Sequence, residues 1–171
     1  MTSTMVSVVL WVTSGVIALV FMEFWAEFLH RRVWHGPLWP IHRSHHEPRT
    51  GRFEFNDILS ASHAPVAAGL ILYGCLGAPS AFRDLAYGWG LGMTTFGLLY
   101  LTFHDGLMHG RLPVQGLRRF AYFRLLCDAH QIHHDRNGGP YGFFYVPPKL
   151  RAYLARCRDA AHQDRITLSA S

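Results

Sequence analysis

The sequence predicts an all-α integral membrane helical bundle with histidine-rich helical segments on its cytosolic side. Half of the 171 residues are hydrophobic and only 16% are charged, whereas an ordinary soluble domain has roughly 25% charged residues. Three long stretches lack Asp, Glu, Lys and Arg, and histidines are concentrated in the segments between and after them. The length is that of one domain, which we expect to cover residues 1–171.

The first uncharged stretch, residues 1–22, is long enough to cross a bilayer as a helix, and we expect a span over residues 5–24. A secretory signal peptide has a basic start, a shorter apolar core and a small-residue cleavage site. Here the start is uncharged and a charged segment, residues 23–32, follows directly. We therefore expect an uncleaved first span.

Two further apolar stretches lie on either side of Arg83 and Asp84. Turn-forming glycine, proline and serine residues precede this charged pair. The pattern predicts a helical hairpin with spans over residues 58–80 and 85–103.

The basic residues predict the orientation in the membrane. Fifteen of the sixteen lie in residues 31–52 or 111–165, and only Arg83 lies at the hairpin tip. By the positive-inside rule, the first loop and the C-terminal third are cytosolic, and the N-terminus is outside. No nucleic-acid-binding motif accompanies the net charge of +5, so anionic lipid is the expected partner and nucleic acid is not.

The C-terminal third is too basic to cross the bilayer core. Residues 112–129 combine apolar side chains with three arginines, which predicts an interfacial segment whose arginines extend toward headgroups. The tail, residues 149–171, mixes apolar and basic residues as a short interfacial helix does, and a solvated tail is the alternative.

Ten of the twelve histidines form four groups with a repeated spacing. HxxxxH followed by HxxHH comes after the first span, and the same two spacings recur after the third span. The predicted topology places all four groups on one membrane face, so ten imidazoles can meet there. The ten are His30, His35, His42, His45, His46, His104, His109, His130, His133 and His134, while His63 and His162 stand apart.

The two spacings make different demands on the backbone. In HxxHH, positions i, i+3 and i+4 share one helix face, so three imidazoles can converge on one point. In HxxxxH the two histidines lie about 140° apart on a regular α-helix. Both can bind metal only if the helix ends or distorts there, and Gly36 and Pro37 predict such an end after His35.

The number of imidazoles favours two metal ions over one. Neutral imidazole suits iron, zinc, copper and nickel, and three isolated cysteines argue against a thiolate site. A structural zinc site closes at four ligands, whereas an oxygen-activating iron site keeps open positions beside an apolar pocket. Ten histidines beside an apolar bundle favour iron. Carboxylates that could orient imidazoles or ligate directly are Glu23, Glu27, Glu47, Asp57, Asp105, Asp128 and Asp135.

The motifs also carry a family resemblance, which covers about residues 20–150. Its stretches are HRRVWHG at 30–36, HRSHHEPR at 42–49, FND at 55–57, HDGLMH at 104–109, HQIHH at 130–134 and GFFYVPP at 142–148. Together they resemble the bacterial-type β-carotene 3-hydroxylases of the fatty acid hydroxylase and sterol desaturase superfamily. The HxxHH spacing is shared across the superfamily, whereas the HDGLMH and HHEPR stretches narrow the resemblance.

The resemblance implies a non-haem diiron centre, molecular oxygen as co-substrate, and electrons from a ferredoxin or ferredoxin reductase. It implies hydroxylation at C3 of the β-ionone rings of β-carotene, giving β-cryptoxanthin and then zeaxanthin, at a bacterial inner membrane. The residues after His109 and the tail beyond Arg151 depart from the family pattern, which leaves details of the substrate open.

A carotenoid is dissolved in the bilayer, so we expect its ring to enter sideways from the membrane. Aromatic residues that could form the walls are Trp34, Trp39, Tyr100 and Phe103, although the two tryptophans also fit an interfacial aromatic belt.

Two other functions stay open on the sequence. A carotenoid 4-ketolase, or another lipid hydroxylase or desaturase of the same superfamily, would share the histidine spacing and differ in the shape of its pocket. A membrane metal-transport protein or a bis-histidine haem carrier would place its ligands within the spans, where this sequence has only His63.

Overall fold

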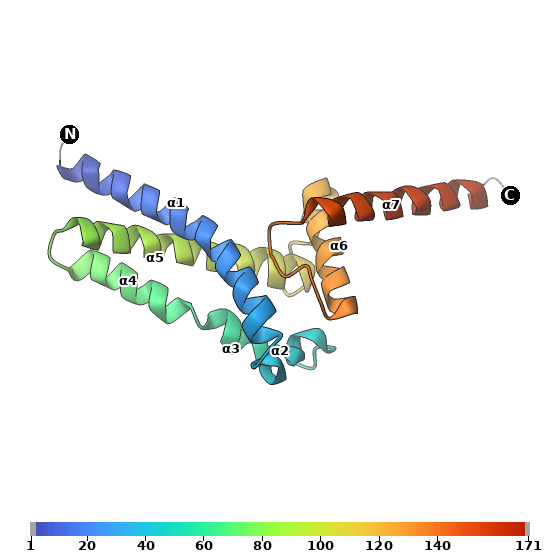
Figure 1. Ribbon diagram of the computed structural model, residues 1–171, viewed down its shortest axis with the longest axis horizontal. Helices are drawn as coiled ribbons and strands as arrows, with labels where there is room; N and C mark the ends of the chain where they lie inside the picture. Colours follow the sequence, from blue (N-terminus) through green and yellow to red (C-terminus); the bar gives the residue numbers. More distant parts are fainter. Residues whose placement is uncertain (1–2, 170–171) are drawn as a thin grey trace.

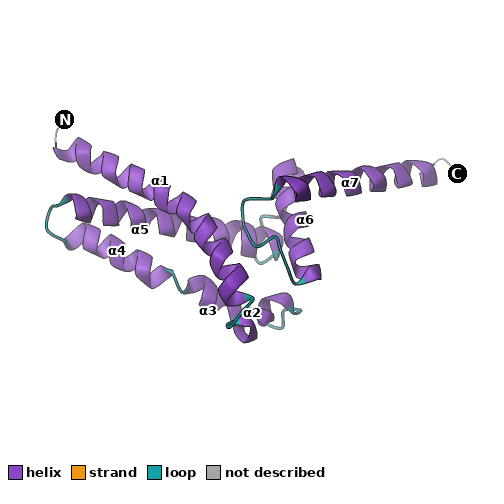
Figure 2. Cartoon of the chain, in the orientation of Figure 1, coloured by secondary structure: helices purple, strands orange, loops and turns teal. Residues whose placement is uncertain are grey.

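The computed structural model describes residues 3–169, and of residues 3, 161, 162 and 164–169 the backbone alone. Throughout this part of the chain the regular structure is helical and no strand occurs (Figure 2), which confirms the all-α prediction. The elements are α1 (Ser3–Leu29), the π-helix η1 (His30–Trp34), α2 (Trp39–His46), α3 (Asn56–Ala61), α4 (Ala64–Leu76), α5 (Ala81–Tyr100), the π-helix η2 (Leu101–Met108), the 3₁₀-helix η3 (Gln115–Arg119), α6 (Ala121–Arg136) and α7 (Pro148–Ser169).

Three long helices form the body of the molecule. α5 packs against both α1 and α4, and the turn between α4 and α5 lies at the same end as the N-terminus (Figure 1). The elements that carry the clustered histidines lie at the other end, and α7 extends away from the rest of the chain (Figure 1). The fold therefore collects the four histidine groups at one end of a helical body.

Two stretches, Thr4–Trp34 and Asn56–Leu76, are long and apolar enough to cross a membrane. The second contains α3 and α4 with a turn between them, where the sequence predicted one uninterrupted span. The third expected span, 85–103, falls on α5 and η2 and is not among these stretches. α5 lies between α1 and α4 (Figure 1) and contains glycine, tyrosine, tryptophan and threonine residues among its apolar ones. That α5 crosses a membrane stays a prediction.

The expected interfacial segment, 112–129, contains η3 and the first half of α6. The tail is helical as far as Ser169, in the form of α7, and residues 170 and 171 lie outside the described residues. Where these helices lie relative to a bilayer stays a prediction.

Glycines bring α1 and α5 into close contact. A Cβ atom at Gly88 would overlap the Ser14 hydroxyl oxygen, and one at Gly92 would overlap the carbonyl oxygen of Gly15. Small residues at such crossings let two helix backbones approach closely, as in paired membrane helices. This packing fixes the direction of α1 and α5, which lead into the two π-helices.

Glu23 on α1 holds the loop formed by residues 137–147. Its Oε1 accepts hydrogen bonds from the backbone N–H groups of Phe143, Phe144 and Tyr145, at 3.0, 2.9 and 3.0 Å. Hydrogen bonds to a carboxylate are stronger than those between neutral groups. The same loop supplies carbonyl oxygens to two of the clustered histidines, so Glu23 positions the site from a distance.

Replacing Glu23 with Ala removes one acceptor from three N–H groups, and we expect the free energy of unfolding to fall by about 3 kcal/mol. Denaturant titration of the detergent-solubilised protein measures the change. Glu27→Ala, one turn further along α1, is the matched control because Glu27 makes none of these bonds. An equal loss of stability in both variants would contradict this role for Glu23.

Candidate metal centre

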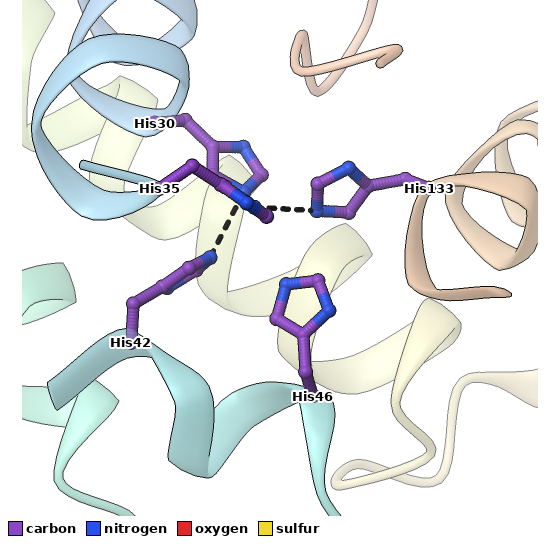
Figure 3. A group of neighbouring side chains, drawn as sticks. All are labelled: His30, His35, His42, His46 and His133. Carbon is purple, nitrogen blue, oxygen red and sulfur yellow. Dashed lines mark hydrogen bonds between the residues drawn. The ribbon is translucent and has the colours of Figure 1, made fainter. Parts of the chain in front are cut away.

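The ten predicted histidines come together as two neighbouring groups. Figure 3 shows the first group, whose imidazoles point toward a common centre from the η1 region, α2 and α6. One nitrogen from each lies within 4.8 Å of the others, and the same holds for the second group. The first group is His30, His35, His42, His46 and His133, and the second is His45, His109, His130 and His134.

His104, the tenth histidine, lies beside the second group. Its Nε2 atom is 3.2 Å from the Nε2 atom of His45, and its ring centroid is 4.8 Å from those of His109 and His130. Each group therefore has five imidazoles. Of the two histidines that the sequence set apart, His63 lies outside both groups, and the side chain of His162 is outside the described residues.

The HxxHH spacing does not send three imidazoles to one point, which corrects the expectation from the sequence. On α2, His42 and His46 belong to the first group and His45 to the second. On α6, His133 belongs to the first group while His130 and His134 belong to the second. Positions i and i+4 differ by about 40° around a helix, whereas i+3 lies about 60° to the other side. Each HxxHH segment therefore contributes to both groups.

The HxxxxH segments lie on π-turns. The His35 N–H donates to the His30 carbonyl at 2.9 Å, and the His109 N–H donates to the His104 carbonyl at 3.0 Å. In this i to i+5 pattern the wider turn brings residues five apart close to the same face. The predicted distortion of the helix is thus confirmed at both segments. Gly110, at φ +69°, then turns the chain out of the second one.

Hydrogen bonds fix the tautomer of four imidazoles. In each, Nδ1 faces an oxygen that only accepts, so Nδ1 carries the proton and Nε2 keeps its lone pair in the neutral ring. The pairs are His30 with the Tyr141 carbonyl at 2.9 Å, His133 with the Gly138 carbonyl at 2.6 Å, His42 with Asn56 Oδ1 at 2.7 Å and His104 with Asp105 Oδ1 at 2.8 Å.

The ring nitrogens that keep a lone pair are better placed to bind metal ions than to form hydrogen bonds with one another. The Nε2 atoms of His30 and His42 are 3.1 Å apart, and two lone pairs facing each other repel unless a cation accepts both. Both ring nitrogens of His46, and Nε2 of His134, are buried without a hydrogen-bond partner among the described residues. Leaving such groups unpaired is costly, and coordination to metal would satisfy one nitrogen of each ring.

Burial also keeps these imidazoles in the form that binds metal. It lowers the pKa to about 4 for His42 and His134, and to about 3 for His109 and His133. Desolvation is the largest cause at each of the four, because burial penalises the charged ring. The rings are neutral near pH 7, with a lone pair available for coordination.

The acceptors behind the imidazoles differ between the groups. In the first group they are neutral carbonyl oxygens, as described above. In the second, His104 donates to the Asp105 carboxylate and His45 Nδ1 lies 3.6 Å from Glu54 Oε2. Arg111 lies 3.4 Å from Asp105 and binds both oxygens of Asp57, at 2.6 and 2.7 Å. A carboxylate acceptor raises the basicity of its imidazole, which applies here to His104.

Sequence reasoning found part of this supporting shell. Of the seven carboxylates that it singled out, Asp105 and Asp57 belong to the shell. Glu47 and Asp128 instead pair with surface arginines. The roles of Asn56, Glu54 and the two backbone carbonyls are not predicted by the sequence. Asn56 stands in the FND stretch, but no local pattern distinguishes the others.

Comparison with known proteins shows a family whose model covers the histidine groups. The family model described as fatty acid hydroxylase matches residues 15–147, which include all ten. The chain belongs to the fatty acid hydroxylase family. No solved structure matches it.

Several curated relatives of this fatty acid hydroxylase family member carry carotenoid hydroxylase names. Beta-carotene 3-hydroxylase 2, chloroplastic, from Arabidopsis thaliana is 45% identical over 135 residues, covering 78% of this chain and 44% of its own. Beta-carotene hydroxylase from Pseudescherichia vulneris is 40% identical over 146 residues, covering 81% of this chain and 80% of its own. The chain thus spans less than half the length of the chloroplastic relative and most of the bacterial one.

Asp105→Asn removes the carboxylate charge that accepts from His104 Nδ1. The variant therefore tests whether the acceptors that support the imidazoles contribute to metal binding. We expect the second group to lose metal affinity by about 10-fold to 100-fold, as outer-shell substitutions typically do, while the first group keeps its metal. Metal retained against a competing chelator measures the change. Asp128→Asn is the control, because Asp128 forms a surface ion pair with Arg158 away from the histidine groups. Unchanged retention in Asp105→Asn would argue against this role for the carboxylate.

Proposed function

We propose that this family member is a membrane-bound β-carotene 3-hydroxylase in which the ten clustered histidines hold two iron ions. The observation that carries the proposal is the pair of five-imidazole groups, with inward-facing lone pairs, in a chain whose relatives are named for this activity. The products would be β-cryptoxanthin and then zeaxanthin. The substrate, the number of irons and each ligand are proposals.

Iron bound by these imidazoles would supply the redox chemistry that activates molecular oxygen. One oxygen atom enters a ring C–H bond and the other leaves as water, with two electrons from a ferredoxin-type donor and two protons from solvent. The chain itself orients the imidazoles through their Nδ1 protons and excludes water. Trp34, Leu107 and Phe143, all buried, provide apolar surroundings at this end of the bundle.

The geometry argues against one of the two alternatives that the sequence left open, and it does not distinguish the other from a 3-hydroxylase. A metal-transport protein would place its ligands within the spans, near the bilayer midplane, whereas the ten imidazoles gather at one end of the helical body. A ketolase or another lipid hydroxylase or desaturase would share the metal site, so the product decides between these enzymes.

We propose the orientation with the histidine groups and the C-terminus in the cytosol of a bacterial cell and the N-terminus outside its inner membrane. A C-terminal fluorescent-protein fusion should be bright, and alkaline phosphatase inserted after Ser80, in the turn between α4 and α5, should be active. The reverse pair of results would overturn the orientation, because fluorescence requires cytosolic folding and phosphatase activity requires export.

His46→Ala and His134→Ala should each abolish hydroxylation, because each removes a buried nitrogen with no other partner. The assay is pigment chromatography with mass detection in cells that accumulate β-carotene. Gln131→Ala is the control, since Gln131 is exposed on α6 between two of the clustered histidines. Full activity in both histidine variants, with normal amounts of protein in the membrane, would overturn the assignment of these two ligands.

A further inference from the structure

A cavity of about 600 Å³ lies between α3, α4 and α5. Small and apolar side chains on two facing helices form most of its wall. They are Ala64, Ala67 and Ala68 from α4, with Met93, Gly97 and Tyr100 from α5. The volume is within the range of roughly 300–1,000 Å³ that small-molecule sites occupy.

A smaller space of about 50 Å³ continues this cavity toward the histidine groups. Both are lined by Ser60, His63, Met93, Gly97 and Tyr100, and the smaller one also reaches Trp34 and Phe143. The two spaces therefore form one path that leads inward from the side of the helical body.

The inner end of this path lies one aromatic ring away from both histidine groups. The Tyr100 ring stacks on His104 of the second group, with centroids 4.4 Å apart. The Phe143 ring stacks on His30 of the first group at 5.6 Å, and lies 5.2 Å from His104. A molecule that fills the path is therefore brought to the place where the two groups meet.

The polar groups along the path are already paired with one another. The Ser60 and Tyr100 hydroxyls are 3.1 Å apart, and His63 Nε2 accepts from Trp25 Nε1 at 3.0 Å. The charged residues in the wall are Asp57, Asp105 and Arg111, and Arg111 forms ion pairs with both carboxylates. The remaining surface is apolar, so it favours an apolar occupant that brings no charge of its own.

The outer surface of the same helices indicates where such an occupant comes from. Val66 and Leu72 on α4, and Leu98 at the cavity on α5, are exposed apolar side chains. α4 also belongs to a stretch long and apolar enough to cross a membrane. The cavity thus opens toward a surface suited to lipid.

We propose that this cavity binds the ring end of the carotenoid, which enters sideways between α4 and α5. The proposal rests on the proposed function. The inner space of about 50 Å³ is little larger than the roughly 30 Å³ that one water occupies in the liquid. A ring that reaches the metal centre must therefore displace the Phe143 side chain, which lies on a loop, while Tyr100 remains the wall in front of His104.

This assignment separates the four aromatic residues that the sequence offered as walls. Tyr100 and Trp34 line the path. Trp39 instead contacts the ring of His35, at 5.1 Å, and Phe103 stacks on Phe123, at 5.0 Å. Neither of these two is among the residues that line the path.

Two glycines provide a matched test of the cavity. A Cβ atom added at Gly97 or at Gly69 meets nothing within 4 Å, so a side chain can leave the backbone at either position without a clash. Gly97→Leu projects into the path, whereas Gly69→Leu, on α4, does not line it. Ala68→Phe fills the cavity from the opposite wall.

The three variants and the wild type are compared as metal-loaded protein in lipid nanodiscs that contain β-carotene, with oxygen and a reduced ferredoxin-type donor supplied for turnover. Two readouts are taken: hydroxylated product, and the change in the visible circular dichroism of β-carotene on binding, which needs no turnover. We expect Gly97→Leu and Ala68→Phe to lose at least 10-fold in both readouts while keeping wild-type metal content. Gly69→Leu should match the wild type.

The outcomes separate this proposal from the proposed function. Wild-type binding and turnover in both cavity-filling variants would place the ring elsewhere and leave the hydroxylase activity intact. A wild type that binds β-carotene without hydroxylating it, with binding lost in Gly97→Leu and Ala68→Phe, would support the cavity and overturn the activity. A wild type that does neither would overturn both.

Discussion

Imidazoles gathered in a place from which water is excluded must turn a lone pair inward, and four of the ten do so by donating the Nδ1 proton to an oxygen. That demand accounts for much of the surrounding structure. Backbone carbonyls, Asn56 and Asp105 hold Nδ1 protons and so direct lone pairs toward a common region. The same burial keeps the imidazoles uncharged. Without metal, nitrogens such as those of His46 would stay buried and unpaired, so the geometry is that of a binding site more than of a stable apolar core.

The helices set this arrangement from a distance. Glycines on α1 and α5 allow the two backbones to cross closely, and each helix then runs into a π-turn that brings a pair of histidines to one face. Glu23 clamps the loop that carries two of the acceptor carbonyls. The site is therefore assembled from segments more than 100 positions apart, and its precision depends on contacts that contain no histidine.

The two histidine groups are related in spacing but not in environment. Neutral carbonyl oxygens stand behind the first group, whereas carboxylates stand behind the second. Tyr100 and Phe143 lie between the second group and the apolar space inside the bundle. Two metal ions held here would experience different fields, and a substrate approaching from α4 and α5 would meet an aromatic wall before it met an imidazole. Such asymmetry suits a reaction in which one side of the centre faces an apolar substrate.

Composition and spacing alone determined the helical class, the first apolar span and the set of ten histidines, because these depend on local sequence. The need for a distortion at HxxxxH also followed from helix geometry. The tertiary structure decided how the imidazoles divide, since a 100° step along α2 or α6 sends neighbouring histidines to different groups. It also decided the turn that divides α3 from α4, and the roles of Glu54, Asn56 and the carbonyls of Gly138 and Tyr141. Those roles arise from contacts between residues far apart in the chain, so no local pattern could contain them.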